Sequence, residues 1–541
     1  MSSAISPAPC IHRIMIMHKA QQRRRPPFFD PQKKSPNGKA FIDSHLSTTW
    51  RKALGSLPLP STPMANSEDS RRQPVHLLLV PLPAQGHLIP LLDLACHLSN
   101  RFAAAGAALS LTVLVTPANL PLLDSFFSAV PSARPLALPL PAHPSLPAGV
   151  EHVRDLPAQI STATLVRALS LLSPDVLRWA RSHPHPPSAI LSDFFLGWTN
   201  RLAADLAVPR LVFYSSGAFA VSIVDHVWQR MPRREDGDGP AALTVLCDLP
   251  SSPVFPFDHL PGVWRRFRAG DPDWEVMREG FLANATGSWG AAINTFDALE
   301  GPFLAHLKRA YPRVWAVGPI SPAGPAVGRG GRSSIPVEEV AAWLDACPPR
   351  SVVYACFGSQ YTPTEKQGRA LAAALEWSGA RFVWAAGGDG AVVPEGFEGR
   401  VAGRGLVVRG WAPQVQILNH GAVGAFVTHC GWNSVLEAAA AGVTLLAWPM
   451  GADQFVNARL LVEELGVAVR VGEGVEGTPE PDDLARVMVE AVAEGAWPEM
   501  RVRATELGRA AAEAVAEGGS SYRALEQMAK ELSEAAYVEM K

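Results

Sequence analysis

Three observations predict an α/β protein with two doubly wound domains. The chain has 541 residues, more than one hydrophobic core usually serves, and it is 48% apolar and 18% charged. From residue 75 onward, short apolar strands alternate with longer helical segments, which is typical of βαβ units in a parallel sheet. The alternation stops at residues 319–336, which are rich in Pro, Gly and Ser, and then resumes.

The expected strands form one group on each side of this stretch. Four precede it, at 75–80, 111–116, 189–194 and 210–215. Five follow it, at 351–357, 381–386, 406–411, 424–429 and 444–449. Ligands of such sheets bind beyond the carboxyl ends of the strands, so a cleft between two domains would suit a two-part substrate.

The expected boundaries follow from these groups. We predict an N-terminal domain over 73–322, a linker over 323–336 and a C-terminal domain over 337–519. Residues 520–541 contain an amphipathic helix that we expect to pack back toward the N-terminal domain.

Residues 1–72 form a basic leader that we place outside the fold. Its first 63 residues carry ten Lys or Arg against two acidic residues and lack apolar periodicity, so we expect disorder. This bias is similar to that of a plastid transit peptide. We favour the alternative of an overlong gene model, because Met64 begins Met-Ala-Asn-Ser shortly before the first strand.

The charge, the apolar runs and the cysteine spacing argue against a nucleic-acid-binding protein, a membrane-spanning protein and a zinc protein. The net charge of −2 gives no reason to expect nucleic acid as a partner. No apolar run approaches the roughly 20 residues of a membrane span, and the six cysteines lack zinc-site spacing. We therefore expect a cytoplasmic monomer, with a plastid location as the alternative if residues 1–63 are a genuine transit peptide.

Residues 424–442 predict an anion site. An apolar strand ends at His429, a tight turn follows, and a helix is expected to begin near Asn433 or Ser434. A helix N-terminus after a strand binds phosphate through free backbone N–H groups and the helix dipole. The alternative is a plain capping box without a ligand, because Glu437 follows Ser434 by three residues.

The wider span from Trp411 to Gln454 carries a resemblance. Its 44 residues begin with Trp-Ala-Pro-Gln, contain His-Cys-Gly-Trp-Asn-Ser with a Glu three residues on, and end with Asp-Gln. At these spacings it closely resembles the signature box of plant secondary-product UDP-glycosyltransferases. The similarity runs from about Val75 to the C-terminus and includes residues 292–300 and 356–360. It implies a GT-B fold, in which two Rossmann-like domains face a cleft and bind the acceptor and the UDP-sugar.

The resemblance also implies the nucleotide-binding residues. Trp411 would stack on the uracil, while backbone groups of Ala412 and Gln414 would bind its edge. Glu437 would accept hydrogen bonds from the ribose. The diphosphate would be held by His429, Asn433, Ser434 and Ser359.

The sugar is expected at the end of the signature box. By the resemblance, Asp453 and Gln454 would bind its hydroxyls and Trp432 would border it. Gln454 and Trp432 favour UDP-glucose, with UDP-galactose and UDP-rhamnose as alternative donors. We expect no metal and no other cofactor, because no Asp-x-Asp site is apparent near the diphosphate.

The predicted catalytic residues are His87 and Asp193. His87 follows the first strand at the start of a helix, whose dipole disfavours imidazolium, so we expect a neutral base at pH 7. Asp193, at the end of another strand, would orient it; the alternative is that Asp193 only caps the next turn. The family resemblance assigns the two residues as general base and its partner.

These residues predict an inverting hexosyltransferase. His87 would deprotonate an acceptor hydroxyl, whose oxygen attacks C1 of glucose as UDP leaves, giving a β-glucoside. The resemblance suggests a small phenolic acceptor such as a flavonoid or benzoate, bound by loops within 118–165 and 225–275. A nicotinamide-dependent oxidoreductase would need a G-x-G-x-x-G turn that the chain lacks, and a non-catalytic binder would not need His87 and Asp193.

Overall fold

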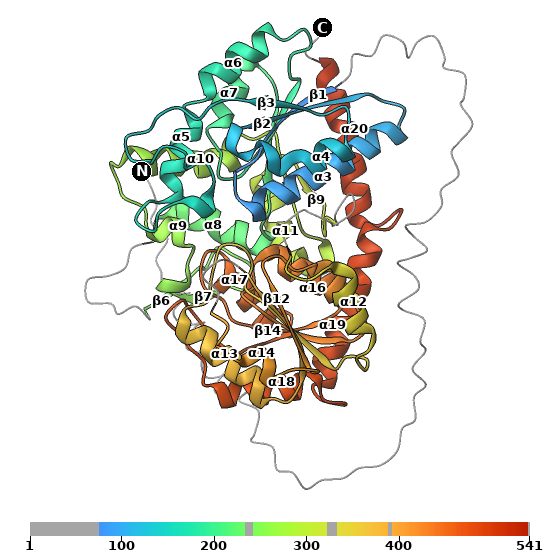
Figure 1. Cartoon of the computed structure of the whole chain (residues 1–541). Helices are drawn as coiled ribbons and strands as arrows, with labels where there is room; N and C mark the ends of the chain where they lie inside the picture. The colour runs from blue at the N-terminus through green and yellow to red at the C-terminus, as the bar shows by residue number, and fades with distance from the viewer. Residues whose placement is uncertain (1–74, 233–241, 322–332, 388–391, 539–541) are drawn as a thin grey trace. The chain divides into compact units, whose positions relative to one another are not determined.

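Two parallel sheets and the helices around them make up the computed structural model (Figure 1). It describes residues 75–232, 242–321, 333–387 and 392–538. The predicted leader, 1–72, and most of the predicted linker, 323–336, lie outside the described residues.

The N-terminal sheet has seven strands in the order β3-β2-β1-β4-β5-β8-β9, all parallel. The order reverses direction between β1 and β4, so these neighbours form the switch point where ligands of such sheets bind. The strands are β1 (Val75–Val80), β2 (Leu109–Val115), β3 (Arg134–Ala137), β4 (Ala189–Asp193), β5 (Arg210–Tyr214), β8 (Gly290–Ile293) and β9 (Val314–Ala316).

The C-terminal sheet has six parallel strands in the order β12-β11-β10-β13-β14-β15. Its switch point lies between β10 and β13. The strands are β10 (Val352–Cys356), β11 (Arg381–Ala386), β12 (Gly405–Arg409), β13 (Val423–Thr428), β14 (Thr444–Ala447) and β15 (Ala468–Arg470).

The expected α/β fold with two Rossmann-like sheets is confirmed, and all nine predicted strands are present with ends within two residues of the prediction. The strands that were missed are short: β3, β8, β9, β15 and the antiparallel pair β6 (Leu243–Val245) and β7 (Val254–Pro256). Each spans three or four residues, too few for an apolar period to stand out.

Helices cover both faces of each sheet. They are α3 (Gln85–Ala104), α4 (Asp124–Ala129), α5 (Thr162–Ser170), α6 (Ser173–Ser182), α7 (Thr199–Leu206), α8 (Ala218–Arg230), α9 (Gly262–Arg265), α10 (Pro272–Gly287), α11 (Asp297–Ala310), α12 (Val337–Asp345), α13 (Glu365–Trp377), α14 (Phe397–Arg400), α15 (Gln414–Leu418), α16 (Trp432–Ala441), α17 (Gln454–Arg459), α18 (Pro481–Val492), α19 (Pro498–Val515) and α20 (Ser520–Val538). None of the described helices is long and apolar enough to cross a membrane.

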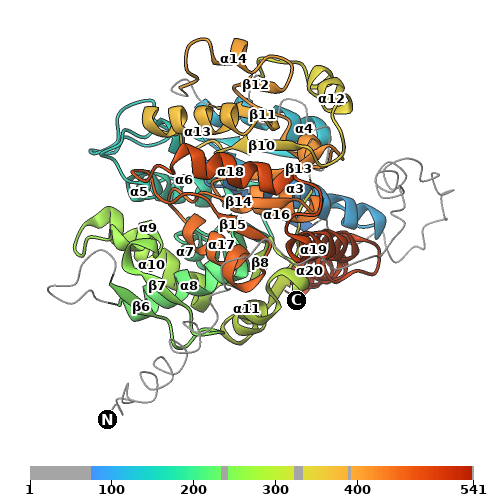
Figure 2. The same ribbon diagram turned by 90° about the horizontal axis from the view of Figure 1, so that it is seen from below.

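The two faces of the C-terminal sheet have separate cores, because successive side chains of a strand point to opposite faces. Val353 of β10 belongs to the core under α13 and α18, whereas Tyr354 belongs to the core under α16 and α19. Figure 2 shows α13 beside α18 and α19 beside α20. Every residue of β1 and of β13 is buried, as expected of central strands in a sheet covered on both sides.

The last helix, α20, packs on the N-terminal sheet (Figure 1). Its buried residues Leu525, Met528 and Leu532 share a core with β1 and α3. An ion pair of 2.8 Å between Arg313 Nε and Glu531 Oε2 links it to the loop before β9. The chain therefore returns to the N-terminal domain after completing the C-terminal one.

Candidate active site

A histidine and an aspartate meet at the N-terminal switch point. His87 is the third residue of α3, which follows β1, and Asp193 is the last residue of β4. Since β1 and β4 are neighbours, their carboxyl ends bring the two side chains together: His87 Nδ1 lies 2.8 Å from Asp193 Oδ2. Because a carboxylate accepts hydrogen bonds, Nδ1 donates and Nε2 is left to take up a proton.

Asp193 combines the two roles that the sequence left open. Its Oδ2 accepts from His87, while its Oδ1 accepts from the backbone N–H of Phe195 at 2.9 Å and so caps the following turn. The Asp193 side chain is fully buried, whereas that of His87 is 17% exposed. The aspartate is therefore fixed from two sides, and the histidine stays accessible.

The pKa of His87 moves in the direction opposite to the one that the helix dipole predicts. Burial lowers this pKa, but the charge of Asp193, its hydrogen bond and the charge of Asp453 together raise it above the usual value. The argument from the dipole left out the neighbouring carboxylates, and a neutral His87 at pH 7 stays a prediction. His87 is accordingly a stronger base than a free imidazole.

Aromatic side chains flank the His87 ring. Phe194 stacks on it with ring centroids 5.4 Å apart, and Phe195 meets it edge-on at 5.2 Å. Phe281 of α10 lies 5.4 Å from the ring of Phe195. Phe194 and Phe281 are buried, and Phe195 is partly exposed, so Phe195 is the ring of these three with surface open beside His87.

A second histidine lies at the C-terminal switch point. His429 follows β13, and its ring lies close to Gly358 and Gly431. A Cβ added at either glycine would come within 2.6 or 2.4 Å of His429 Nε2, so only glycine leaves room for this ring. Burial lowers the pKa of His429 to about 4, which keeps it neutral, and its buried Nδ1 has no hydrogen-bond partner among the described residues. Ser359, predicted to bind the diphosphate, is exposed in the loop after β10.

The helix of the predicted anion site begins earlier than expected. Helix α16 starts at Trp432 with Gly431 as its N-cap, and no side chain caps it. The alternative of a plain Ser434–Glu437 capping box is therefore wrong. Both residues instead accept hydrogen bonds from Gln414 Nε2, at 2.9 Å from Ser434 Oγ and 2.7 Å from Glu437 Oε2.

Glu437 is positioned by a residue for which the sequence predicted only backbone contacts. Burial raises the pKa of Glu437 to about 7, and the hydrogen bond from Gln414 opposes this rise. Gln414 lies on α15, shortly after Trp411, which is partly exposed, and Ala412, which is buried. The predicted uracil-binding segment and the predicted ribose ligand are thus connected.

Asp453 and Gln454 lie at the start of α17. Gln454 Oε1 accepts from the backbone N–H groups of Met450 and Gly451, at 2.9 and 3.0 Å. Only its Nε2 is then left to bind a sugar hydroxyl. Burial raises the pKa of Asp453, while hydrogen bonds from Asn457 and Ser216 oppose the rise.

Trp432 reaches across the domain interface. Its Nε1 donates to the carbonyl of Asn294, just after β8, at 2.7 Å, and the indole packs on Gly217. Asn433 Nδ2 also crosses, donating to the carbonyl of Gly86 at 3.2 Å. The two predicted residue sets therefore face each other, and the side chain of Trp432 has a bridging contact that the sequence did not predict.

Ser215, Ser216 and Asn457 were missed at the sequence level. Ser215 Oγ lies 3.3 Å from His87 Nδ1, and Ser216 Oγ donates to Asp453 Oδ2 at 3.0 Å. A signal was available, because both serines stand at the carboxyl end of a predicted strand, where ligands of such sheets bind.

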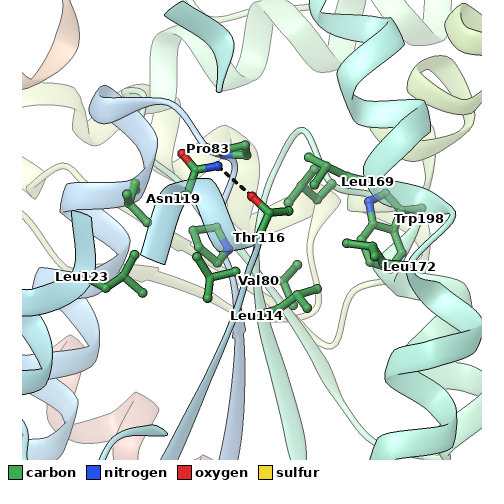
Figure 3. A pocket seen from close by; sticks show the side chains of 13 residues that line it. Val80, Pro83, Leu114, Thr116, Asn119, Leu123, Leu169, Leu172 and Trp198 are labelled. Carbon is green, nitrogen blue, oxygen red and sulfur yellow. Dashed lines mark hydrogen bonds between the residues drawn. The ribbon is translucent and has the colours of Figure 1, made fainter. Parts of the chain in front are cut away.

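A small, mainly apolar pocket lies at the carboxyl ends of β1 and β2, where Val80, Leu114 and Thr116 line it (Figure 3). Pro83 and Leu88, on either side of His87 in the sequence, both line it. Its polar side chains Thr116 and Asn119 bind each other at 2.8 Å, which leaves mainly apolar surface for a ligand. Asn119 and Leu123 come from the segment 118–165, one of the two whose loops are expected to bind the acceptor.

Comparison with known proteins identifies the family. Residues 332–484 match the family described as UDP-glucoronosyl and UDP-glucosyl transferase. The chain is 47% identical over 469 residues to flavonol 3-O-glucosyltransferase UGT89B1 of Arabidopsis thaliana, covering 85% of this chain and 97% of that protein. The chain belongs to the plant UDP-glycosyltransferases. This UDP-glycosyltransferase is also 38% identical to flavonol 7-O-rhamnosyltransferase of Arabidopsis thaliana, covering 84% and 98%.

Solved structures agree with this assignment. Arabidopsis thaliana UGT89C1 complexed with UDP-L-rhamnose aligns with this UDP-glycosyltransferase at a TM-score of 0.68 and 39% identity, covering 85% of this chain and 100% of that one. The same protein complexed with quercetin aligns at a TM-score of 0.67 and 37% identity, with the same coverage. The GT-B fold and the enzyme class expected from the sequence are confirmed.

Proposed function

We propose that this UDP-glycosyltransferase transfers glucose from UDP-glucose to a hydroxyl of a small phenolic acceptor and forms a β-glucoside. The observation that carries the proposal is the 2.8 Å contact between His87 Nδ1 and Asp193 Oδ2. It leaves Nε2 as the base and keeps the imidazole in one orientation.

The raised pKa of His87 suits deprotonation of the acceptor, and the neutral His429 beside the N-terminus of α16 suits binding of the leaving UDP. A phenol has a pKa of about 10, so a histidine of raised pKa is matched to accept its proton. The phenolic oxygen then bonds to C1 of the sugar as the bond from C1 to the diphosphate breaks. The leaving UDP would be stabilised by the N-terminus of α16 and by the N–H of neutral His429.

A phenolic acceptor is supported by the surroundings of His87. Phe194 stacks on the His87 ring, Phe195 meets it edge-on, and the nearby pocket is mainly apolar. The named relatives include flavonol glycosyltransferases, and one aligned structure contains quercetin. A flavonoid or benzoate with a free hydroxyl fits these surfaces.

We propose UDP-glucose as the donor because Gln454 and Trp432 favour it, and UDP-rhamnose is the second candidate. The second candidate is favoured by the relative named as a rhamnosyltransferase and by the aligned structure that contains UDP-L-rhamnose. No group of three His, Cys, Asp or Glu side chains within the described ranges is placed to hold a metal ion. We propose transfer without a divalent cation.

The test is a donor and acceptor matrix with the full chain. UDP-glucose, UDP-galactose and UDP-rhamnose are each offered with flavonols and hydroxybenzoates, with and without EDTA. We expect the highest kcat/KM with UDP-glucose, a β-anomeric product by proton NMR, and no effect of EDTA. An α-linked product would contradict the mechanism. A tenfold preference for UDP-rhamnose would show that UDP-rhamnose, and not UDP-glucose, is the donor.

A further inference from the structure

The turn between β5 and α8 contacts both predicted functional centres through adjacent residues. Ser215 Oγ lies 3.3 Å from His87 Nδ1 in the N-terminal domain. Ser216 Oγ donates at 3.0 Å to Asp453 Oδ2 in the C-terminal domain. One short segment therefore links the proposed base to the proposed sugar-binding carboxylate.

The same turn is held rigidly on its other side. The Glu300 carboxylate accepts from the N–H groups of Ala218 and Phe219, at 2.7 and 2.8 Å, and so caps α8. Gly217 packs so closely on Trp432 that an added Cβ would come within 2.4 Å of the indole. The Ser216 hydroxyl is thus presented to Asp453 from a fixed backbone, and rigid support is what a positioning contact requires.

We propose that Ser216 is a positioning residue for the sugar donor, which holds Asp453 so that its free lone pairs meet the sugar hydroxyls. This inference rests on the proposed role of Asp453 in sugar binding. A carboxylate has about four lone-pair sites. Ser216 uses one on Oδ2, Asn457 and the backbone N–H of Asp453 also donate to the carboxylate, and the remaining lone pairs are left for the sugar. Because the contact joins the two domains, Asp453 has this orientation only while they are together.

Asp453 has few other constraints on its orientation. Asn457, one turn further along α17, also donates a side-chain hydrogen bond to it. Removal of the Ser216 hydroxyl leaves the carboxylate held only from its own domain. The sugar should then bind less tightly, while UDP, which lacks the sugar, should bind as before.

The experiment compares UDP with UDP-glucose on Ser216→Ala in the full chain. By calorimetry without acceptor, we expect the Kd of UDP-glucose to rise about tenfold, equivalent to 1.4 kcal/mol, and the Kd of UDP to change less than twofold. Ser216→Thr keeps the hydroxyl and should restore the affinity. In an Asp453→Ala background, Ser216→Ala should add nothing.

The matched control is Ser222→Ala on the same helix. Ser222 Oγ is buried and donates to the carbonyl of Ala218 at 2.8 Å, so it tests loss of a hydroxyl from α8 without loss of the Asp453 contact. Equal weakening of UDP and UDP-glucose by Ser216→Ala, or an effect of Ser222→Ala as large, would overturn the proposal. If wild type transfers no glucose, the proposed function fails, and the same binding comparison is made with whichever UDP-sugar binds more tightly than UDP.

Discussion

The two switch-point histidines follow different strands of similar sheets and have opposite electrostatics. By strand order, β1 corresponds to β10 and β4 to β13, so His87 and His429 lie on opposite sides of their switch points. His87 follows β1 and is the third residue of α3, whereas His429 follows β13 and lies in the turn before α16. His87 has the Asp193 carboxylate 2.8 Å away and a raised pKa. His429 has glycines beside its ring, and burial lowers its pKa to about 4.

The difference teaches that the neighbours of a histidine near a helix N-terminus can set the direction in which its pKa moves. A helix N-terminus alone disfavours imidazolium at both positions. At His87 the carboxylates of Asp193 and Asp453 reverse this and raise its pKa. At His429 no neighbouring charge in the described part of the chain opposes the effect of burial, and the histidine stays neutral near pH 7.

The largest effect is expected from removing the base. His87→Ala should lower kcat by about a thousandfold, within the usual range for loss of general-base catalysis, and change the Kd of UDP little. Steady-state kinetics at saturating substrates measures this. His97→Ala, also on α3, is the control, because its Nε2 contacts only the carbonyl of Ser321. Near-normal kcat in His87→Ala would remove His87 from the mechanism.

Removing the charge of Asp193 should lower the pKa of His87 toward the low pKa of His429. Activity requires unprotonated His87, so kcat rises with pH through the pKa of His87, which Asp193 raises above its usual value. Asp193→Asn should lower the maximal kcat about a hundredfold and move this rise to lower pH. The pH profile of kcat measures both changes. An unmoved profile would show that Asp193 does not set this pKa.

His429 should affect donor binding without titrating near neutral pH. His429→Ala should raise the Kd of UDP about tenfold, because a hydrogen bond to a charged group is worth about 1.5–3 kcal/mol. With a pKa of about 4, His429 contributes no pH dependence between pH 6 and 8. The Kd of UDP for wild type and variant is measured across that range. If the difference between the two Kd values grew as the pH fell toward 6, His429 would be gaining charge there.

The glycines beside His429 provide the smallest expected effect. Gly431→Ala puts a Cβ within 2.4 Å of the ring, and overpacking of this kind destabilises by about 1–3 kcal/mol. Gly86→Ala, beside His87, is the matched change, because its Cβ would meet only Asn433 at 3.8 Å. Urea unfolding of both free variants measures the contrast. Equal stabilities would show that the His429 ring can move aside freely.

Much of this arrangement could be predicted from local sequence. The strands next to His87, Asp193 and His429 are long apolar runs, and the residues that follow each run stand at the edge where ligands bind. The strand and turn before α16 predicted an anion site, although the helix starts at Trp432 and lacks the capping box.

The remainder depends on contacts between distant segments. Ser216 and Asp453 are 237 residues apart in the sequence, and Trp432 and Asn294 are 138 apart. No local pattern specifies which loops of two domains meet. The upward shift of the His87 pKa could not be predicted for the same reason, since it depends on carboxylates from other segments.

The position of α20 has a consequence for how the chain matures during synthesis. Leu525, Met528 and Leu532 complete the core around β1, and Glu531 pairs with Arg313, 218 residues earlier. The domain that leaves the ribosome first is thus the one whose core is finished last. A nascent chain that lacks α20 exposes apolar surface of the N-terminal domain, so chaperone demand should persist until translation ends.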